Sequence, residues 1–538
     1  MESFAADLAT MVRRPLEAGH IAEMRKVGDV VHFDTGDIVQ EPGAATELFH
    51  FVLSGELEAV NPTTNARLGI ATLGPGQFFG DLQFLTGGVS LAGARALEPS
   101  ELLCVPREKM LKLMSDIPEM SDIIVTVLAA RRRRAVEQAD SGLTLIGIDS
   151  DRNIRQVASF AARNRIPYRA LDADADEARD AARACDIAPG TPAVIFGGDK
   201  VVNPPTPEAL AKVLGLDLTI GTDDVFDVLI VGAGPAGVAA AVYAGAEGLR
   251  ALVLEDLAIG GQAGTSSRIE NYMGFPTGIS GGDLVGRGEV QAMKFGTRFS
   301  VPRRVNALTQ CSEKVFHAAL EDGREVSAKA LIVATGVQYR KLPLDGLERL
   351  EGAGVYYAAT DTEARWCRDS EVAVIGGGNS AGQAAMFLAR TSRHVHVLVR
   401  RGGLSDTMSD YLLQRLQAHP RITIHTRTQV TALHGEDQLT GVTISDGNSG
   451  QNWDLNTKAL FVMVGAAPNT EWLSGMVELD SRGFVRTGRE VGGRSEYETS
   501  CAGVFAVGDV RAGSVKRVAS AVGEGSVVMS AVWAHVNG

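Results

Sequence analysis

The stretch Val228-Leu-Ile-Val-Gly-Ala-Gly-Pro-Ala-Gly237 decides the fold of the second half of this chain. A run of apolar, mostly β-branched residues leads into three glycines spaced G-x-G-x-x-G, and an alanine-rich stretch of helical character follows. Glycines at these places allow a tight turn and let the backbone approach a pyrophosphate, whose charge then meets the helix N-terminus. The context of strand, turn and helix predicts a dinucleotide site that contains Gly232, Gly234 and Gly237.

A second turn of the same kind, Gly376-Gly-Gly-Asn-Ser-Ala381, follows the apolar run Val372–Ile375 and opens another alanine-rich stretch. Two such turns predict two dinucleotides, and a protein that holds two usually passes electrons between them. The residues that we expect at the second nucleotide are Gly376, Gly378, Asn379, Ser380 and Ala381.

The strand after each turn indicates which ribose the site accepts. The first, Ala251–Glu255, ends in an acid about twenty residues after the glycines, placed for a hydrogen bond to a free 2′-hydroxyl. The second, His394–Arg401, ends in Arg400 and Arg401 instead. Two guanidinium groups can pair with a 2′-phosphate, so we expect NADPH at the second site. The alternative is that both arginines are solvated charges at a strand end, which leaves NADH open.

Further motifs follow the first turn in order: Gly260-Gly-Gln262, Ile269–Pro276, Ala334-Thr-Gly336, Gly465–Thr470 and Gly503–Asp509. Residues 224–538 thereby resemble the low-molecular-weight thioredoxin reductase family. The resemblance implies an FAD-binding domain, residues 224–340 and 466–538, interrupted by an NAD(P)H-binding domain, residues 341–465.

The resemblance also implies a homodimer, and two hinge-like crossings near Gly336–Pro343 and Gly465–Pro468. With Glu255 on the ribose of FAD, it assigns the remaining flavin contacts to Gly261, Gln262, Asn271, Thr335, Gly336, Gly508, Asp509, Arg517, Val518 and Ala519.

One departure from the family concerns its redox dithiol. Members carry a Cys-x-x-Cys pair just before the second glycine turn, where this chain has Ala358 and Asp361. No two of its five cysteines have that spacing. Disulfide exchange needs a neighbouring thiolate to resolve the mixed disulfide, so we expect no internal relay. Asp361 and Cys367 are the candidate catalytic residues, although a lone cysteine is more often a packed thiol.

Residues 1–140 contain turn signals at short intervals between short apolar segments, a rhythm that predicts a small β-barrel or jelly roll. This unit resembles the cyclic-nucleotide-binding fold. In that family a Glu follows the cassette glycine and an Arg some ten residues on pairs with the cyclic phosphate. This chain has Asp81 and Ser90 at those places, and Arg95 is displaced along the cassette. We therefore expect the fold, and leave binding of cAMP or cGMP open.

Residues 141–220 read as strands and helices in the order β-α-β-α-β-β-α, which resembles thioredoxin. No cysteine follows the first strand, so this thioredoxin-like domain has no redox dithiol. The alternative is a phosphoryl-receiver-like sheet, because Asp149 and Asp151 stand at a strand end.

Composition limits the location and the partners. The apolar runs are far too short to cross a membrane and no export signal precedes them, while unpaired cysteines suit the cytoplasm. A net charge of −13 argues against nucleic acid. The ten dispersed histidines, His394-x-His396 included, do not indicate a metal site.

The sequence therefore predicts a multidomain fold: a cyclic-nucleotide-binding-like barrel, a thioredoxin-like α/β middle domain and a two-dinucleotide α/β reductase core. We expect hydride transfer from NAD(P)H to FAD and onward to an external acceptor, which could be a protein disulfide, a ferredoxin-like protein, a quinone or oxygen. The alternative is a redox or ligand sensor that holds both nucleotides, regulates a protein partner and turns over little.

Overall fold

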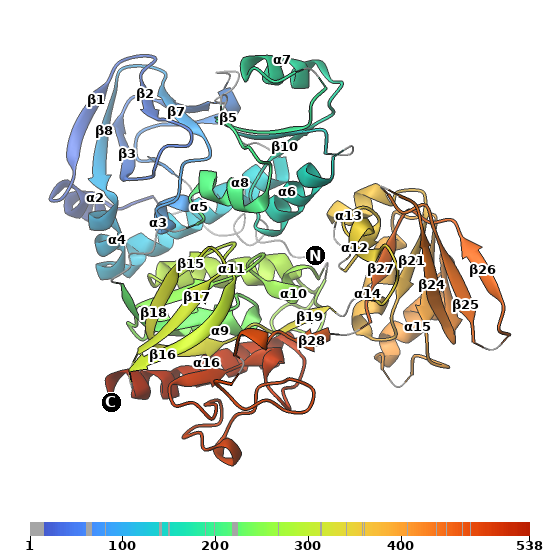
Figure 1. Ribbon diagram of the computed structural model, residues 1–538. Coiled ribbons are helices and arrows are strands. Elements are labelled where there is room, and N and C mark those ends of the chain that lie inside the picture. Colours follow the sequence, from blue (N-terminus) through green and yellow to red (C-terminus); the bar gives the residue numbers. More distant parts are fainter. Residues whose placement is uncertain are drawn as a thin grey trace.

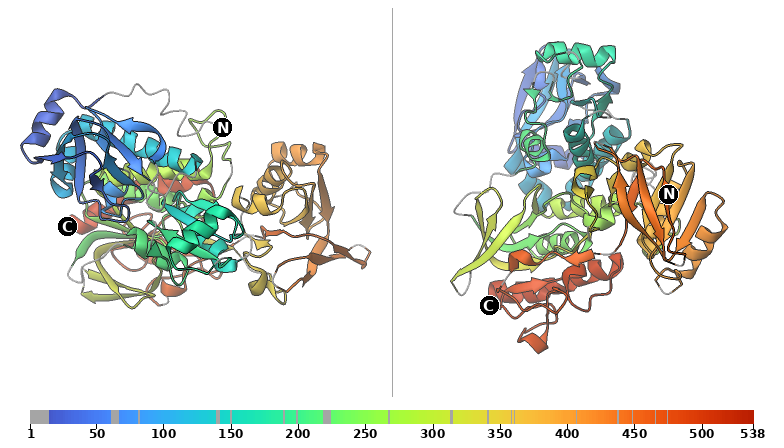
Figure 2. Two further views of the ribbon diagram at one scale, coloured as in Figure 1. Left: turned by 90° about the horizontal axis from the view of Figure 1, so that it is seen from above. Right: turned by 45° about the vertical axis from the view of Figure 1, so that its right-hand side comes forward.

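The computed structural model describes residues 15–538, apart from 61–66, 81, 139–141, 149–150, 189, 198–199, 218–223, 267, 313–314, 340–341, 358, 360, 406, 437, 448, 465 and 474. A β-barrel comes first along the chain, a small α/β unit second, and two larger α/β units last (Figure 1). We call the last two the first nucleotide unit, which contains Gly232, and the second nucleotide unit, which contains Gly376. The barrel and the small unit lie on one side of the first nucleotide unit (Figure 2).

The barrel consists of two four-stranded antiparallel sheets, in the orders β1-β8-β3-β6 and β2-β7-β4-β5, so the predicted jelly roll is confirmed. On β3, Phe49 and Phe51 pack under the flanking helices, while Val52 packs with the second sheet. The turn after β3 requires glycine at Gly55, where φ is +85° and a Cβ would lie 2.6 Å from the Cα of Ser100. The barrel elements are α2 (Ala18–Arg25), β1 (Asp29–Phe33), β2 (Ile38–Gln40), β3 (Leu48–Ser54), β4 (Leu57–Val60), β5 (Arg67–Leu73), β6 (Phe78–Phe79), α3 (Gln83–Thr86), β7 (Gly93–Ala96), β8 (Ser100–Pro106), α4 (Arg107–Asp116) and α5 (Pro118–Gln138).

The small unit has a mixed four-stranded sheet in the order β10-β9-β11-β12. β10 runs parallel to β9, whereas β11 and β12 are antiparallel, as in thioredoxin. A receiver sheet would be all parallel, so that alternative is wrong. Asp149 lies outside the described residues, and the Asp151 carboxylate caps α6 by accepting from the N–H groups of Asn153 and Ile154. The elements are β9 (Leu143–Ile146), α6 (Arg152–Arg163), β10 (Arg169–Leu171), α7 (Asp176–Ala184), β11 (Ala193–Phe196), β12 (Lys200–Val201) and α8 (Pro207–Leu214).

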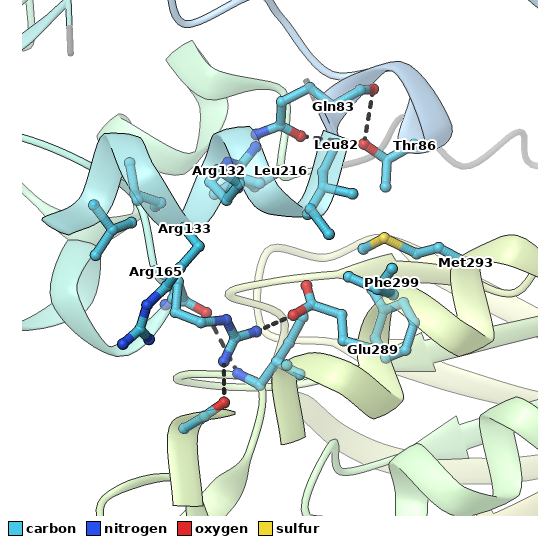
Figure 3. Close-up of a pocket in the computed structure, with 18 of the residues that line it drawn as sticks. Leu82, Gln83, Thr86, Arg132, Arg133, Arg165, Leu216, Glu289, Met293 and Phe299 are labelled. Carbon is cyan, nitrogen blue, oxygen red and sulfur yellow. Dashed lines mark hydrogen bonds and ion pairs between the residues drawn. The ribbon is translucent and has the colours of Figure 1, made fainter. Parts of the chain in front are cut away.

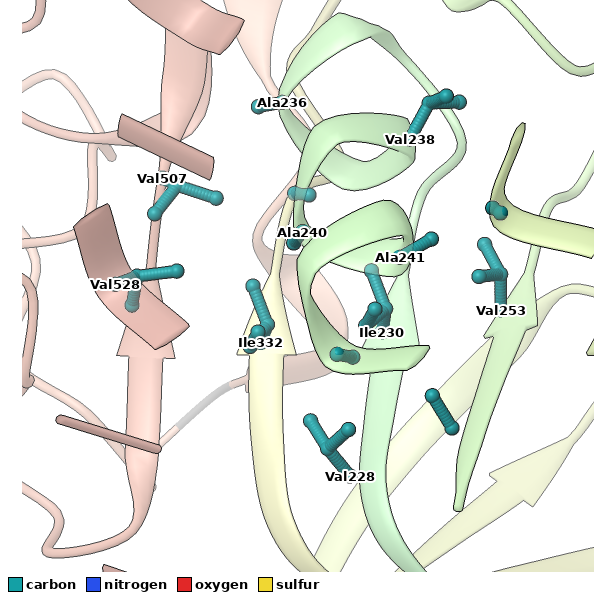
Figure 4. Packing of buried hydrophobic residues seen from close by; sticks show 14 of the residues in the cluster. Val228, Ile230, Ala236, Val238, Ala240, Ala241, Val253, Ile332, Val507 and Val528 are labelled. Carbon is teal, nitrogen blue, oxygen red and sulfur yellow. The ribbon is translucent and has the colours of Figure 1, made fainter. Parts of the chain in front are cut away.

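The first nucleotide unit has parallel strands in the order β15-β14-β13-β18-β29, extended by the antiparallel β17 and β16. Helix α9 lies against this sheet, and its Ala240 and Ala241 pack with Ile230 and Ile332 below and with Val528 of α16 beside them (Figure 4). Small side chains on α9 let the helix, the sheet and α16 approach closely. The elements are β13 (Val225–Val231), α9 (Pro235–Ala246), β14 (Ala251–Leu254), α10 (Gly261–Gly264), α11 (Gly281–Lys294), β15 (Arg298–Ser300), β16 (Val305–Ser312), β17 (Val315–Leu320), β18 (Glu325–Val333), β29 (Val504–Ala506), η3 (Gly508–Val510) and α16 (Val518–Asn537).

The second nucleotide unit has a parallel sheet in the order β20-β27-β21-β22-β23 and a three-stranded antiparallel sheet β24-β25-β26. The chain enters and leaves it through β19 (Val337–Tyr339) and β28 (Ala466–Pro468), which pair antiparallel. Gly465 of the expected crossing lies outside the described residues. The elements are α12 (Leu347–Leu350), β20 (Val355–Tyr356), α13 (Asp361–Trp366), β21 (Glu371–Ile375), α14 (Asn379–Leu388), β22 (His394–Val399), α15 (Asp410–Ala418), β23 (Ile422–Thr426), β24 (Thr428–His434), β25 (Gly441–Asp446), β26 (Asn452–Leu455) and β27 (Leu460–Val462).

Helix α11 of the first nucleotide unit also belongs to the core of the barrel. Val290 and Met293 on this helix pack with the aromatic cluster of the barrel. Ion pairs join the same helix to both N-terminal units, Arg133 with Asp283 and Arg165 with Glu289. The barrel and the small unit therefore pack against the first nucleotide unit.

Candidate active site

The first glycine turn joins β13 to α9 and leaves space at the helix N-terminus. Gly232 has φ +104°, and a Cβ there would lie 2.4 Å from the carbonyl oxygen of Ala334. A Cβ at Gly237 would lie 1.9 Å from the carbonyl oxygen of Gly232. At Gly234 a Cβ would meet no atom within 4 Å. Two glycines thus close the turn, and the third leaves room where a pyrophosphate fits at a helix N-terminus.

Glu255 lies directly beside this turn, at the end of β14. Its carboxylate accepts hydrogen bonds from the N–H groups of Ala233 (2.7 Å) and Leu257 (3.1 Å). Burial, with Asp256 adjacent, raises the pKa of Glu255. A carboxylate fixed at this point suits the ribose hydroxyls of a nucleotide that enters along the turn.

The segment around α10 packs on the same turn. The N–H of Gly260 donates to the carbonyl of Ala233 at 2.8 Å, and a Cβ at Gly261 would lie 3.2 Å from the Cα of Gly234. The Gln262 amide donates to the carbonyl of Val337, where the chain crosses to the second nucleotide unit. Farther along, Asn271 is exposed.

The chain returns from the second nucleotide unit through β28, and Thr335 of the first nucleotide unit holds the segment that follows. The Thr335 hydroxyl donates to the carbonyl of Asn469 at 2.8 Å. Gly336 follows with φ +61° and directly precedes the β19–β28 pair. Arg517 is the N-cap residue of α16, and Val518 and Ala519 form its first turn.

Glu524 organises the second flavin motif, and the sequence analysis missed it. Its buried carboxylate accepts from the N–H of Gly508, from the guanidinium of Arg511 (2.7 Å) and from the hydroxyl of Ser514 (3.1 Å). These bonds fix the loop that carries Asp509, whose own pKa is raised by burial. The available signal was a single acid inside the otherwise apolar α16.

The second glycine turn joins β21 to α14. Gly376 has φ +149°, and a Cβ there would lie 2.4 Å from the carbonyl oxygen of Met463, whereas a Cβ at Gly378 would make only an ordinary contact, 3.9 Å from the carbonyl oxygen of Thr407. The side-chain Oδ1 of Asn379 accepts from the N–H of Ser409 at 2.8 Å, while Ser380 is exposed and Ala381 is buried.

Arg400 and Arg401 follow β22 directly and are both exposed. Because β22 is the parallel neighbour of β21, both arginines lie at the sheet edge where the glycine turn begins. This geometry accommodates a nucleotide with a 2′-phosphate.

The structure does not support a redox role for Cys367. The side chain is fully buried in the core of the second nucleotide unit, and its thiol donates to the carbonyl of Glu363 at 3.0 Å. Burial, with Glu363 beside it, raises the pKa of Cys367 to about 12, so the reactive thiolate is scarce at neutral pH. Asp361 begins α13, and Ala358 lies outside the described residues.

The phosphate cassette of the barrel is occupied by internal contacts. The Arg95 guanidinium on β7 pairs with the buried Glu58 on β4. The Ser90 hydroxyl donates to the carbonyl of Ala92 at 2.8 Å, and Asp81 lies outside the described residues. Arg95, the arginine nearest to the place where the family binds the phosphate, is thus already paired with a carboxylate.

Two histidines and a carboxylate lie close together on the parallel sheet of the second nucleotide unit. His396 contacts His425 at 3.1 Å and the carboxylate of Glu371 at 3.2 Å. Burial lowers the pKa of both His396 and His425. Nevertheless, the described part of the chain contains no group of three or more His, Cys, Asp or Glu side chains that could hold a metal ion. Within the same residues, no helix is long and apolar enough to cross a membrane.

Comparison with known proteins agrees with this geometry. Residues 226–525 match the family described as pyridine nucleotide-disulphide oxidoreductase, and residues 30–116 match the cyclic nucleotide-binding domain. Thioredoxin reductase from Mycolicibacterium smegmatis is 37% identical over 301 residues, which cover 56% of this chain and 93% of that protein. Thioredoxin reductase from Streptomyces clavuligerus is 36% identical over 306 residues, covering 56% and 91% of the two proteins.

Among solved structures, Lactococcus lactis thioredoxin reductase in its FR conformation is similar, with a TM-score of 0.53 at 29% identity over 58% of this chain and 99% of that one. The chain therefore belongs to the pyridine nucleotide-disulphide oxidoreductase family, with a reductase core of the thioredoxin reductase type and a cyclic nucleotide-binding domain before it. It is an oxidoreductase that uses FAD and NADPH, and the two glycine turns fit these nucleotides.

Proposed function

We propose that this protein oxidises NADPH and passes the electrons from its flavin to an acceptor outside the chain, without an internal dithiol. The observation that carries the proposal is a contrast within one core. Both glycine turns have a conformation that fits a dinucleotide. In contrast, Ala358 and Asp361 stand where the thioredoxin reductase family has its Cys-x-x-Cys pair, and Cys367 is buried as a thiol.

The residues of the chain divide the task between binding and orientation. A bound FAD would supply the hydride acceptance from NADPH and the two-electron transfer to the acceptor. The N-terminus of α9 with Gly234 would hold the pyrophosphate of FAD, Glu255 would hold its ribose, and Glu524 fixes the loop that carries Asp509. Arg400 and Arg401 orient NADPH through its 2′-phosphate. With a quinone the reaction balances as NADPH + H⁺ + quinone → NADP⁺ + hydroquinone.

Steady-state NADPH oxidation tests the proposal, with an artificial quinone or with thioredoxin as acceptor. We expect turnover with the quinone, because that path needs only access to the flavin, and little with thioredoxin, because no thiolate forms the mixed disulfide. Cys367→Ser leaves the quinone rate unchanged. Robust thioredoxin reduction by the parent protein would overturn the proposal.

The second candidate is a sensor that holds FAD and NADPH, regulates a protein partner and turns over little. The packing of α11 into the barrel core favours it, because a change at the reductase core could reach the barrel. Absence of quinone turnover in FAD-loaded protein would select this candidate.

Three further parts of the proposal concern the oligomeric state, the location and the barrel: the family resemblance implies a homodimer, and the unpaired cysteines suit the cytoplasm. A homodimer is checked by sedimentation, and a cytoplasmic location by cell fractionation. Cyclic nucleotide binding is disfavoured by the Arg95–Glu58 pair, and calorimetric titration with cAMP and cGMP is expected to show no heat above dilution.

A further inference from the structure

Helix α6 of the small unit extends from one nucleotide unit to the other. The helix has 12 residues and therefore spans about 18 Å. Its C-terminal end lies on the first nucleotide unit, and its N-terminal end lies beside α12 and α13 of the second (Figure 1). The chain itself joins the two nucleotide units through the paired strands β19 and β28. The small unit thus makes a further link between them.

The residues that follow α6 fix its C-terminal end to the first nucleotide unit. The Arg165 guanidinium pairs with the carboxylate of Glu289 on α11 (Figure 3). The side-chain amide of Asn164 donates to the carbonyl of Leu257 at 3.2 Å, and its oxygen accepts from the N–H of Ile259 at 3.3 Å. Leu257 and Ile259 lie just before α10, which packs on the first glycine turn.

The base of the small unit is fixed to the same nucleotide unit. The carbonyl of Leu216, just after α8, accepts from the N–H of Val301 at 3.3 Å, and Val301 packs in the hydrophobic core of the small unit. The Asp217 carboxylate pairs with the guanidinium groups of Arg303 and Arg324. Because these contacts hold both α6 and the base, we expect the small unit to move with the first nucleotide unit.

The N-terminal end of α6 meets the second nucleotide unit through polar groups. The Arg152 guanidinium, in the first turn of α6, donates to the carbonyl of Glu348 on α12 at 3.3 Å. Tyr168 of the small unit lies within electrostatic reach of α13. Burial raises the pKa of Tyr168, while Arg365 on α13 lowers it and Glu363 raises it.

This second contact is more exposed than the first. Arg152 and Arg365 are both exposed, whereas Arg165 and Glu289 are largely covered. Exposed polar contacts contribute little free energy each, so the N-terminal end of α6 affects the orientation of the second nucleotide unit more than its stability. Reversal of one charge is therefore enough to release this end.

The missing dithiol makes one orientation sufficient. In the thioredoxin reductase family the Cys-x-x-Cys pair belongs to the second nucleotide unit, at the places of Ala358 and Asp361. A unit that carries both a dithiol and a nicotinamide must present each to the flavin in turn, since both cannot occupy the same place. Without the dithiol, the nicotinamide is the one group that this unit presents.

We propose that the small unit is a brace, in which α6 holds the second nucleotide unit in the orientation for hydride transfer from NADPH to FAD. Arg152 is the positioning residue at the second nucleotide unit, and Asn164 and Arg165 anchor the brace to the first. This role rests on the proposed function, because hydride transfer is the step that the orientation serves.

Distances between spin labels on the two nucleotide units test the brace in the full-length protein with FAD and NADP⁺ bound. Labels on unnatural side chains at Tyr411 of α15 and Val527 of α16, both exposed, leave the native cysteines untouched. Arg152→Glu puts a carboxylate opposite the Glu348 carbonyl and should broaden or shift the distance distribution. Arg183→Glu, the same charge change at a 78% exposed position on α7, should not.

Anaerobic reduction of the flavin by NADPH, followed by stopped-flow absorbance, tests the orientation itself. Arg152→Glu should lower the limiting rate about tenfold, because small misplacements of reacting groups are costly, and leave the Kd for NADPH unchanged. A merely structural role would not separate the rate from the Kd. Arg152→Lys keeps a donor for the Glu348 carbonyl and should behave as the parent does.

The outcomes separate this role from the proposed function. If NADPH does not reduce the flavin of the parent, the proposed function fails, while the distance distributions still decide whether the brace exists. A distribution in Arg152→Glu that matches the parent would overturn the brace. A broadened distribution with an unchanged limiting rate would overturn the orientation that we assign to it.

Discussion

At the scale of single residues, the first glycine turn separates a binding position from a packing position. Gly234 has open space where a Cβ would point, whereas a Cβ at Gly237 would overlap the carbonyl of Gly232. Gly234→Val should therefore fold and lose FAD, while Gly237→Val should fail to fold stably. Flavin absorbance per protein and circular dichroism distinguish the two results. Full FAD occupancy in folded Gly234→Val would refute the assigned site.

The choice between NADPH and NADH also belongs to single residues. If Arg400 and Arg401 hold a 2′-phosphate, each lost charge-assisted contact costs about 1.5–3 kcal/mol, tenfold or more in affinity. The double variant Arg400→Ala, Arg401→Ala should raise KM for NADPH and leave KM for NADH unchanged. Arg390→Ala, exposed in the same unit, serves as the control. Equal efficiency of the parent with NADH would contradict the assignment.

At the scale of elements, strand β3 makes the barrel sensitive to acid. Burial lowers the pKa of His50 on this strand from 6.5 to about 4, so the folded barrel holds a neutral imidazole. The unfolded chain protonates the His50 imidazole more readily than the folded barrel does. The free energy of unfolding therefore has its full value above pH 6.5 and falls as the pH drops toward 4. The total loss of unfolding free energy is ~3 kcal/mol, because a shift of one pKa unit corresponds to about 1.36 kcal/mol.

Urea unfolding between those pH values, followed by circular dichroism, measures this loss. His50→Leu should remove most of the pH dependence, and His434→Leu, an exposed histidine on β24, should leave it intact. An unchanged pH slope in His50→Leu would show that another group is responsible.

The sequence predicted features that lie within one element and missed contacts between elements. The turn at Gly232, the thioredoxin-like strand order and the jelly roll follow from local patterns of glycine and apolar residues, and the structure has all three. The bonds of Glu524 to Gly508 and of Arg95 to Glu58 join residues on different elements, so no local pattern reports them. The same holds for Cys367, whose burial depends on how α13 packs.

At the scale of the whole molecule, the packing of the barrel on α11 links the barrel to the first nucleotide unit, although the sequence predicted them as separate domains. Val290 belongs to the first nucleotide unit but packs in the barrel core. Val290→Ala should destabilise the barrel by ~1–3 kcal/mol although no barrel residue changes, because it leaves a cavity beside the barrel aromatics. Hydrogen exchange in β3 and β8 reports the barrel, and the four tryptophans, all at or beyond Trp366, report the reductase core.

Val527→Ala is the matched control, since Val527 is 58% exposed on α16 and packs against neither unit's core. Faster exchange in β3 with Val290→Ala and not with Val527→Ala would confirm that the barrel draws part of its core from the reductase. If β3 exchange is unchanged, the barrel is stable without its contacts to α11. The direction of the effect therefore decides whether the N-terminal domain and the flavin site form one cooperative unit.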